Sequence, residues 1–519
     1  MTNSMEHNSR TYLLIVAAAI LAYSCPVFAS GNVGKTVHGK FFAASSSDFV
    51  GDSTTDNTKA LQAAIDSASS AGGGVVELKD GKFLSGPLTM KSNVTLRIDS
   101  SATLYATTSD SAFAGLDPFA FIGCDHDSNI TITGGGAIDG NGQPWWTAYE
   151  ATGVSRPRLI EFWNTNHIVI DSVTLENSPM FNVSLENSWY DTLEYDTILA
   201  PSNSPNTDGI DPATCHVVYI AHCLINNGDD DIAVKSGRSD PTDPNAGCSR
   251  IWIKDCTFLH GHGVSIGSET SGGVDSMYVD SCSFNGTDNG IRIKSYRGDG
   301  GDVRHCVYSN ITMQDVANPI WISGYYPKIA AESDPAQPVT ATTPDFHDIS
   351  IIHMVSSGSP TAGLMVGLPE LPMKNMLLQN DTISASTGLT IRNAAVDTEN
   401  TLSTATYGPG YILQVNGTFS RLTSVQPAPI LPSKFDLDQN YPNPFNPTTV
   451  ISYSIPQMGH VSIEVYDILG NRVATLVDGV QSPGAHQVVF KGSGLASGVY
   501  FYRLESDGFT QTKKLMLLK

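Results

Sequence analysis

The chain has 519 residues, of which 40 % are hydrophobic and 15 % are charged, and its formal net charge is −22. A chain of this length is expected to form more than one domain. The acidic balance excludes a nucleic-acid partner, because phosphate binding needs a basic surface. Any anionic substrate would have to be held by local cations rather than by the overall field.

Residues 1–29 have the pattern of a secretory signal peptide. A polar start ends at Arg10, residues 13–22 form an apolar run, and Val27-Phe28-Ala29 is a plausible cleavage site. The apolar run is too short to cross a membrane as a helix. A lipoprotein anchor at Cys25 is the alternative, although Tyr23 and Ser24 before it match that signal poorly. We therefore expect the mature chain to be exported.

Residues 56–71 are predicted to form a helix that Asp56 or Asn57 caps and the glycines 72–74 end. We expect it to cover the open first coil of a repeat structure. The apolar positions at helical spacing are Ala60, Leu61, Ala64, Ile65 and Ala68.

From residue 75 onward, short alternating strands are separated by Gly, Asn, Asp and Ser turns. The clearest series, at 168–170, 193–195, 218–220, 251–253 and 277–279, has spacings of 25, 25, 33 and 26 residues. One strand per period of this size predicts a solenoid, here an all-β parallel β-helix. Within the longest interval, residues 237–247 are predicted to be a loop that walls a cleft, and residues 375–395 to form one or two further coils.

Four polar turns between residues 206 and 295 share one register and run into short strands, with repeat distances of 22, 32 and 27 residues. Stacked parallel strands would bring equivalent residues to about 4.8 Å from one another. Asp208, Asp230 and His262 would then form a column with Asp229 beside it, while Arg292 and Lys294 would point outward on the same side. The aligned sets are Gly209, Asp231, Gly263 and Gly290; Asp208, Asp230, His262 and Asn289; and Asp211, Ala233, Ser265 and Arg292.

Seven cysteines remain if Cys25 is removed with the signal peptide, so at least one thiol must be free. Cys223, Cys256 and Cys282 fall in one register and are expected to stack inward as small apolar residues. A metal site is the alternative, but the paired spacing of zinc ligands is missing.

The composition changes near residue 424, where a Pro-rich linker (424–432) separates residues 30–423 from residues 433–519. The last segment has alternating strands at 450–455, 461–466, 487–490 and 499–504, which predict a small β-sandwich. Its Asn443-Pro444-Phe445-Asn446-Pro447 and Gly498-Val499-Tyr500 resemble the C-terminal sorting domain of the type IX secretion system. This resemblance implies passage through an outer membrane and release or surface attachment. A carbohydrate-binding module is the alternative.

The central motifs resemble the ordered signature of the polygalacturonases, the pectin-cleaving glycoside hydrolases with a right-handed parallel β-helix. The resemblance rests on Asn206-Thr207-Asp208, Asp229-Asp230, Gly261-His262-Gly263 and Arg292-Ile293-Lys294, and extends loosely from residue 35 to 420. One departure is Asp231, where many relatives have Cys.

Glycoside hydrolysis needs a proton donor and a group that activates water or attacks directly, and three clustered carboxylates can supply both. The resemblance implies an inverting enzyme in which Asp229 is the general acid while Asp208 and Asp230 activate the water. It further implies that His262 hydrogen-bonds the acid, Asp229, and modulates its protonation.

The same resemblance implies that Arg292 and Lys294 hold the sugar carboxylate and that Asn206 belongs to the substrate site. It also implies that Tyr326 stacks on a sugar ring. The alternative for Tyr326 is a packing role. No metal cofactor is expected, and we expect a monomer acting on pectin or polygalacturonate.

Two alternatives remain open. A pectate lyase would share the β-helix but use Ca²⁺, which clustered aspartates can ligate, and a non-catalytic surface glycan-binding protein would not need every acid. The sequence leaves endo or exo action, methyl-ester tolerance and the type of galacturonan undecided.

Overall fold

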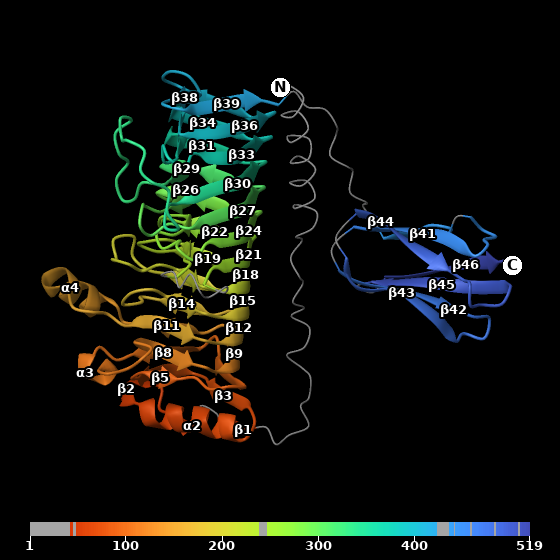
Figure 1. Cartoon of the computed structure of the whole chain (residues 1–519). Helices are drawn as coiled ribbons and strands as arrows, with labels where there is room; N and C mark the ends of the chain where they lie inside the picture. Colours follow the sequence, from red (N-terminus) through yellow and green to blue (C-terminus); the bar gives the residue numbers. More distant parts are fainter. Residues whose placement is uncertain are drawn as a thin grey trace. The chain divides into compact units, whose positions relative to one another are not determined.

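The computed structural model describes residues 42–44, 48–237, 246–422, 435–440, 442–456, 459–481, 484–506 and 509–518. They belong to two compact units, one within residues 36–423 and the other including residues 424–519 (Figure 1). The predicted signal peptide, the predicted linker and most of the predicted 237–247 loop lie outside the described residues. Among the described helices, none has the length and apolar character needed to cross a membrane.

The larger unit is a solenoid of three parallel sheets, so the predicted β-helix is confirmed. From β3 to β38, each coil contributes one strand to sheet A, then one to sheet B, then one to sheet C. The strands of sheet A are β1 (Phe42–Ala44), β3 (Gly74–Leu78), β6 (Val94–Ile98), β9 (Ser128–Thr133), β12 (Asn166–Asp171), β15 (Trp189–Glu194), β18 (His216–Ala221), β21 (Cys248–Lys254), β24 (Val274–Asp280), β27 (Asp302–Ser309), β30 (Asp345–Ile352), β33 (Met373–Gln379), β36 (Ala394–Glu399) and β39 (Gly417–Arg421).

The strands of sheet B are β2 (Asp52–Asp56), β4 (Gly81–Ser85), β7 (Ala102–Ala106), β10 (Ala137–Asp139), β13 (Thr174–Glu176), β16 (Thr197–Leu199), β19 (Leu224–Asn226), β22 (Thr257–Leu259), β25 (Ser283–Asn285), β28 (Thr312–Gln314), β31 (Val355–Thr361), β34 (Thr382–Thr387) and β37 (Leu402–Ala405). Those of sheet C are β5 (Leu88–Thr89), β8 (Ala120–Asp125), β11 (Arg158–Trp163), β14 (Val183–Glu186), β17 (Ile210–Ala213), β20 (Ile232–Val234), β23 (Val264–Ile266), β26 (Asn289–Lys294), β29 (Asn318–Ser323), β32 (Gly363–Val366), β35 (Leu389–Arg392) and β38 (Tyr411–Leu413).

The predicted first helix is α2 (Thr58–Ser70), which lies at the end of the solenoid (Figure 1). Its buried residues are Leu61, Ala64, Ile65 and Ala68, whereas Ala60, predicted to belong to the same face, is exposed. Of the two predicted caps, Asp56 accepts the backbone N–H of Thr58 at 2.9 Å, while the side chain of Asn57 is bound to backbone groups of neighbouring loops. The helix therefore closes the apolar end of the first coil.

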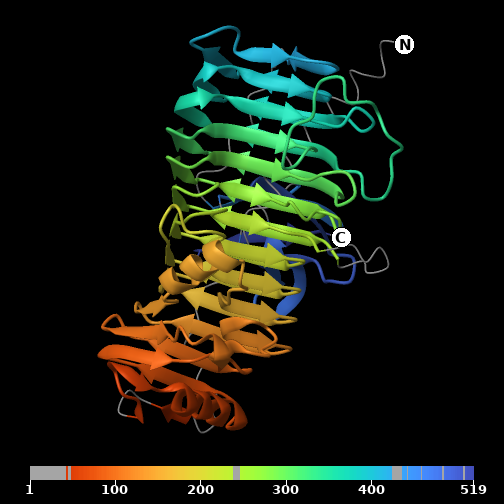
Figure 2. The ribbon, with the colours of Figure 1, turned by 90° about the vertical axis from the view of Figure 1, so that its left-hand side faces the viewer.

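Two further helices, α3 (Asp110–Phe113) and α4 (Gln143–Thr152), lie in connections from sheet B to sheet C. The second projects from the solenoid in Figure 1 and lies in front of the strands in Figure 2.

One predicted strand register in sheet A is wrong. Leu193 pairs with Ile170, 23 residues earlier, and with Ile220, 27 residues later, instead of at two spacings of 25. Asp191 thus occupies an inward position, fully buried, where its Oδ1 accepts the backbone N–H of Ile168 at 3.1 Å. A shift of two residues keeps every side chain on its face, so alternation alone could not detect it. The later spacings of 33 and 26 are confirmed.

All seven cysteines of the described residues are free and buried. Strand pairing places Cys223, Cys256 and Cys282 in one register, as predicted. Burial raises the pKa of Cys256 well above its usual value, which keeps the thiol neutral and suits an apolar stack better than a thiolate metal site.

The smaller unit has two antiparallel sheets. One consists of β40 (Asp436–Leu437), β41 (Thr448–Ile455) and β44 (Gly484–Lys491), and the other of β42 (Gly459–Tyr466), β43 (Arg472–Gln481), β45 (Gly498–Ser506) and β46 (Phe509–Leu517). Residues from both sheets, such as Ile451 and Ile463, share one buried core. The predicted sandwich is confirmed, with β40, β43 and β46 as additional strands.

Candidate active site

The four motifs lie at turns from sheet B to sheet C, directly before or at the start of β17, β20, β23 and β26. Strand pairing joins Ile210 to Ile232, Ile232 to Val264 and Val264 to Ile291, so the predicted alignment is confirmed. The tight turns explain the glycines. Gly263 has φ of +78°, and a Cβ there would lie 2.1 Å from the carbonyl oxygen of Asn289.

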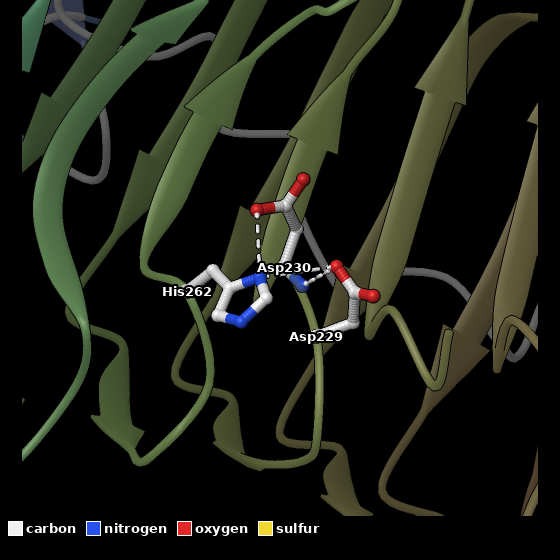
Figure 3. Close-up of side chains that lie close together, drawn as sticks. All are labelled: Asp229, Asp230 and His262. Carbon is white, nitrogen blue, oxygen red and sulfur yellow. Dashed lines mark hydrogen bonds and ion pairs between the residues drawn. The ribbon is translucent and has the colours of Figure 1, made fainter. Parts of the chain in front are cut away.

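Asp229 and His262 form a hydrogen-bonded pair at the mouth of this arrangement (Figure 3). The His262 Nδ1 lies 3.2 Å from Asp229 Oδ1, which also accepts the backbone N–H of Asp230 at 2.9 Å. Burial raises the pKa of Asp229, but His262 and the backbone N–H outweigh it and hold the pKa below its usual value. The same hydrogen bond, opposed by burial, raises the pKa of His262. In the free site the proton of this pair therefore resides on the imidazole.

Asp230 is held ionised by two cations from β26. Its Oδ2 lies 2.6 Å from Lys294 Nζ, and its Oδ1 lies 2.7 Å from Arg292 Nη1 and accepts the Ser265 hydroxyl at 2.7 Å. Burial opposes ionisation, but Lys294 and Arg292 together lower the pKa of Asp230 below its usual value. The two predicted sugar-binding cations thus neutralise a buried carboxylate in the free site.

Asp208 is buried one coil before Asp230 and has a different electrostatic environment. Lys235 Nζ lies 3.2 Å from its Oδ2 and 2.5 Å from Oδ2 of Asp211. Burial, with the nearby charge of Asp211, raises the pKa of Asp208 well above its usual value despite the ammonium. Oδ1 of Asp208 has no hydrogen-bond partner in the described part of the chain, so it is available to a water molecule or a substrate hydroxyl.

Asn206 connects the acid pair to a buried arginine. Its Nδ2 donates to Asp229 Oδ2 at 3.4 Å, and its Oδ1 accepts from Arg156 Nη2 at 2.7 Å. Arg156 also donates to the carbonyl oxygens of Pro179 and Pro205 and is 4 % exposed. The predicted site residue Asn206 is therefore fixed in place by a group that the sequence analysis did not identify.

Tyr326 lies beside the cation pair, with its ring centroid 5.4 Å from Lys294 Nζ and 6.0 Å from the Arg292 guanidinium carbon. It is partly exposed, whereas Tyr325 is buried in a small apolar cluster. Arg297 anchors the connection that follows, through Asp334 at 2.7 Å and Glu370 at 2.6 Å. The packing role considered for Tyr326 therefore fits Tyr325 better, while the Tyr326 ring is partly exposed beside Arg292 and Lys294.

The structure brings together all eight predicted site residues, and it adds residues that the sequence analysis missed. The added contacts come from Lys235, Asp211, Ser265 and Arg156. Asp211 and Ser265 stand in one of the aligned sets, and Lys235 follows Val234 at the next outward position, so their alternation with buried neighbours could have marked all three as outward-facing.

Asp231, the departure from the resemblance noted in the sequence, is fully buried. Its Oδ2 accepts the backbone N–H of Gly263 at 2.9 Å, and burial raises its pKa well above its usual value. This hydrogen bond ties the histidine turn to the start of β20.

Asp229, Asp230 and His262 each offer a ligand atom, all within 4.8 Å of one another. Both oxygens of Asp230 are already paired with cationic side chains, and Arg292 and Lys294 would repel a dication. The donor set therefore does not fit a metal ion well.

Comparison with known proteins shows two family matches. Residues 73–350 match the model of glycosyl hydrolases family 28, and residues 439–518 match that of the secretion system C-terminal sorting domain. The chain is 33 % identical to an endo-polygalacturonase of Pectobacterium carotovorum over 75 % of this chain and 100 % of that protein. It is 32 % identical to a probable polygalacturonase of Vitis vinifera over 64 % of this chain and 72 % of that one.

Solved structures give the same result for the fold. A polygalacturonase from Erwinia carotovora matches with 28 % identity and a TM-score of 0.54, over 75 % of this chain and 97 % of that one. An exopolygalacturonase from Thermotoga maritima matches with 20 % identity and a TM-score of 0.61, over 77 % and 96 % of the two chains.

Proposed function

The chain belongs to glycosyl hydrolases family 28 and is a polygalacturonase-type hydrolase, and on this premise we propose that it cleaves α-1,4-galacturonosyl linkages of pectin or polygalacturonate with inversion. The observation that carries the proposal is the division of the carboxylates. Asp229 pairs with His262. Asp230 pairs instead with Arg292 and Lys294, and Asp208 pairs with Lys235.

We assign the general acid to Asp229. An arriving sugar carboxylate adds negative charge beside it and engages Arg292 and Lys294, and both changes raise the pKa of Asp229. The proton shared with His262 then moves to the carboxylate and on to the leaving oxygen.

Asp230, kept ionised by its two cations, and Asp208, with its free Oδ1, would hold and deprotonate the attacking water. Tyr326 would lie against a sugar ring, and Asn206 would keep Asp229 oriented. All of these groups come from one chain, so the proposed site needs no second subunit and a monomer would suffice.

The C-terminal sorting domain indicates export by type IX secretion, to the cell surface or the medium. We propose residues 30–423 as the catalytic domain, 424–432 as a linker and 433–519 as the sorting domain. The two units have separate cores, which supports this division.

Digestion of polygalacturonate in a chelator tests the proposal. We expect new reducing ends without ultraviolet-absorbing unsaturated products, and a single inverted anomer at first release. Unsaturated products that depend on Ca²⁺ would instead show a lyase, and binding without new reducing ends would show a glycan-binding protein. Monomer alone as product would mean exo action, and a ladder of oligomers endo action.

A further inference from the structure

Two columns of outward-facing side chains run along sheet C and form the floor on which the catalytic groups stand. In each strand they alternate with inward residues that are almost completely buried, such as Ile232, Val234, Ile291 and Ile293. The first column is Gly123, Glu161, Ser184, Asp211, Ala233, Ser265, Arg292, Trp321, Leu364 and Thr390. The second is Asp125, Trp163, Glu186, Ala213, Lys235, Gly267, Lys294, Ser323, Val366 and Arg392.

The charges of these floor columns are segregated along the solenoid. All the acids stand on β8 to β17, and all the cations stand on β20 or later coils. The acids are Asp125, Glu161, Glu186 and Asp211, and the cations are Lys235, Arg292, Lys294 and Arg392. An extended polyanion lying on this floor would meet the acidic side chains before Asp230 and the cationic side chains after it.

The part of the floor columns that carries the cations, from β20 to β35, has hydrogen-bond donors that an anion could use. Arg392 is 3 % exposed and donates from Nη1 to the carbonyl oxygen of Ala330, while its Nε and Nη2 have no partner among the described residues. Three strand spacings separate it from Lys294 in the same column, or about 14 Å. A buried guanidinium with two free donors suits a carboxylate at this distance.

The acidic half has the features of a site for uncharged sugar rings. Glu161 is 1 % exposed, and its Oε2 is buried without a partner in the described part of the chain. Its Oε1 is occupied by Trp163 Nε1 and by Arg158, each at 3.1 Å. An acceptor-only oxygen beside a partly exposed indole fits a sugar hydroxyl and a pyranose face.

A cavity of about 190 Å³ continues this half beyond Trp163. Leu88, Leu116 and Pro118 supply apolar lining, and Asp117 and Asp125 supply acids, with Lys91 as a cation of the lining. Glu186, the next acid of the floor toward the catalytic groups, is exposed. A free galacturonate carboxylate in this half would therefore face carboxylates on the floor and in the cavity.

We propose that the enzyme prefers substrates in which a charged block of sugars adjoins an uncharged block, which we call the charge boundary. Free galacturonate residues would lie over β26 to β35, and methyl-esterified or otherwise uncharged sugars over β8 to β17. The proposal rests on the proposed galacturonan hydrolysis and adds its substrate class. It follows that partly esterified pectin, with blocks of both kinds, is a better substrate than a uniformly ionised chain.

Three oligogalacturonates of one length test this proposal: one fully de-esterified, one methyl-esterified only in the non-reducing half, and one only in the reducing half. Affinities are measured on the full chain with Asp229→Asn, which needs no turnover, and kcat/KM is measured on the wild type. We expect one block isomer to bind more tightly than the free acid and the other more weakly, with a difference between the isomers on the order of tenfold, the size of a few screened charge contacts.

The exposed Glu186 allows a matched pair of variants. In the Asp229→Asn background, Glu186→Gln should tighten binding of the fully ionised oligomer by about threefold, the size of one screened charge contact. Glu194→Gln makes the same change on sheet A and should leave binding unchanged.

Equal affinities for the two block isomers, or a free acid that binds more tightly than both, would overturn the charge boundary. Failure of the wild type to release reducing ends from all three oligomers would overturn the proposed hydrolysis instead, and the affinities would still decide the boundary.

Discussion

The ammonium of Lys235 lies 3.2 Å from Oδ2 of Asp208, one coil along the floor of the site. It also lies 2.5 Å from Oδ2 of Asp211, so one cation serves two buried carboxylates. In the proposed mechanism Asp208 must be ionised to deprotonate water, and its pKa is already raised by burial and by Asp211. The balance between Asp211 and Lys235 therefore sets the lowest pH at which the site can work.

Removing Lys235 and removing Asp211 should shift the acidic limb of the pH profile of kcat/KM in opposite directions. Lys235→Met deletes the stabilising cation, so the pKa of Asp208 rises and the limb moves to higher pH. Asp211→Asn deletes the repelling charge, so the limb moves to lower pH. Steady-state kinetics across pH measures both, and shifts of the same sign would show that Lys235 acts only through packing.

Asp229→Asn should lower kcat by about 10²- to 10⁴-fold on polygalacturonate, the usual contribution of general acid catalysis. KM should change little, because Arg292 and Lys294 would still hold the sugar carboxylate. Arg292→Ala should instead raise KM. A substrate with a very acidic leaving group needs less protonation and should partly rescue Asp229→Asn but not Asp208→Asn. If kcat of Asp229→Asn stays near the wild-type value, the general acid is Asp208 or Asp230 instead.

The buried Asp191 should make the solenoid less stable as the pH rises. Burial raises its pKa from the usual 3.8 to about 7, so it binds a proton more tightly when folded. Its stabilising contribution is complete below about pH 4 and is lost as the pH rises through 7.

Asp191→Asn should therefore stabilise the solenoid more at pH 8 than at pH 5, because the loss is partial at pH 5 and complete at pH 8. The difference should be roughly 2 to 4 kcal/mol, since each pKa unit corresponds to about 1.4 kcal/mol. Thermal unfolding at the two pH values measures it, with the exposed Asp66→Asn as control. An equal effect at both values would mean that Asp191 is ionised throughout.

A protein ending at residue 422 should retain the turnover of the full chain on polygalacturonate. Every group of the proposed catalytic site lies upstream, and the two units have separate cores. Circular dichroism would establish that the shortened protein is folded. A folded protein with lost activity would show that the sorting domain contributes to the site.

The catalytic register could be predicted from the sequence because each turn carries its own glycine and polar residue, which fix the alignment independently of the strands. The sheet A register failed at Asp191, because a carboxylic acid stands in an inward place where an apolar residue was expected.

Other features depend on contacts across many residues. Lys235 reaches Asp208 from 27 positions away, and Arg297 reaches Glu370 from 73. Nothing local in the sequence marks such pairs. The segregated floor charges likewise emerge only when ten coils are aligned by strand pairing.

The buried thiols give the solenoid a built-in reporter of its own opening. All seven described cysteines lie in the larger unit, and residues 424–519 contain none. Burial also raises the pKa of Cys248 and Cys306 to about 12, so the reactive thiolate is scarce while the coils remain closed. The rate at which an alkylating reagent modifies the native protein would thus measure how fast the coils of the solenoid separate. The sorting domain would give no signal in this measurement.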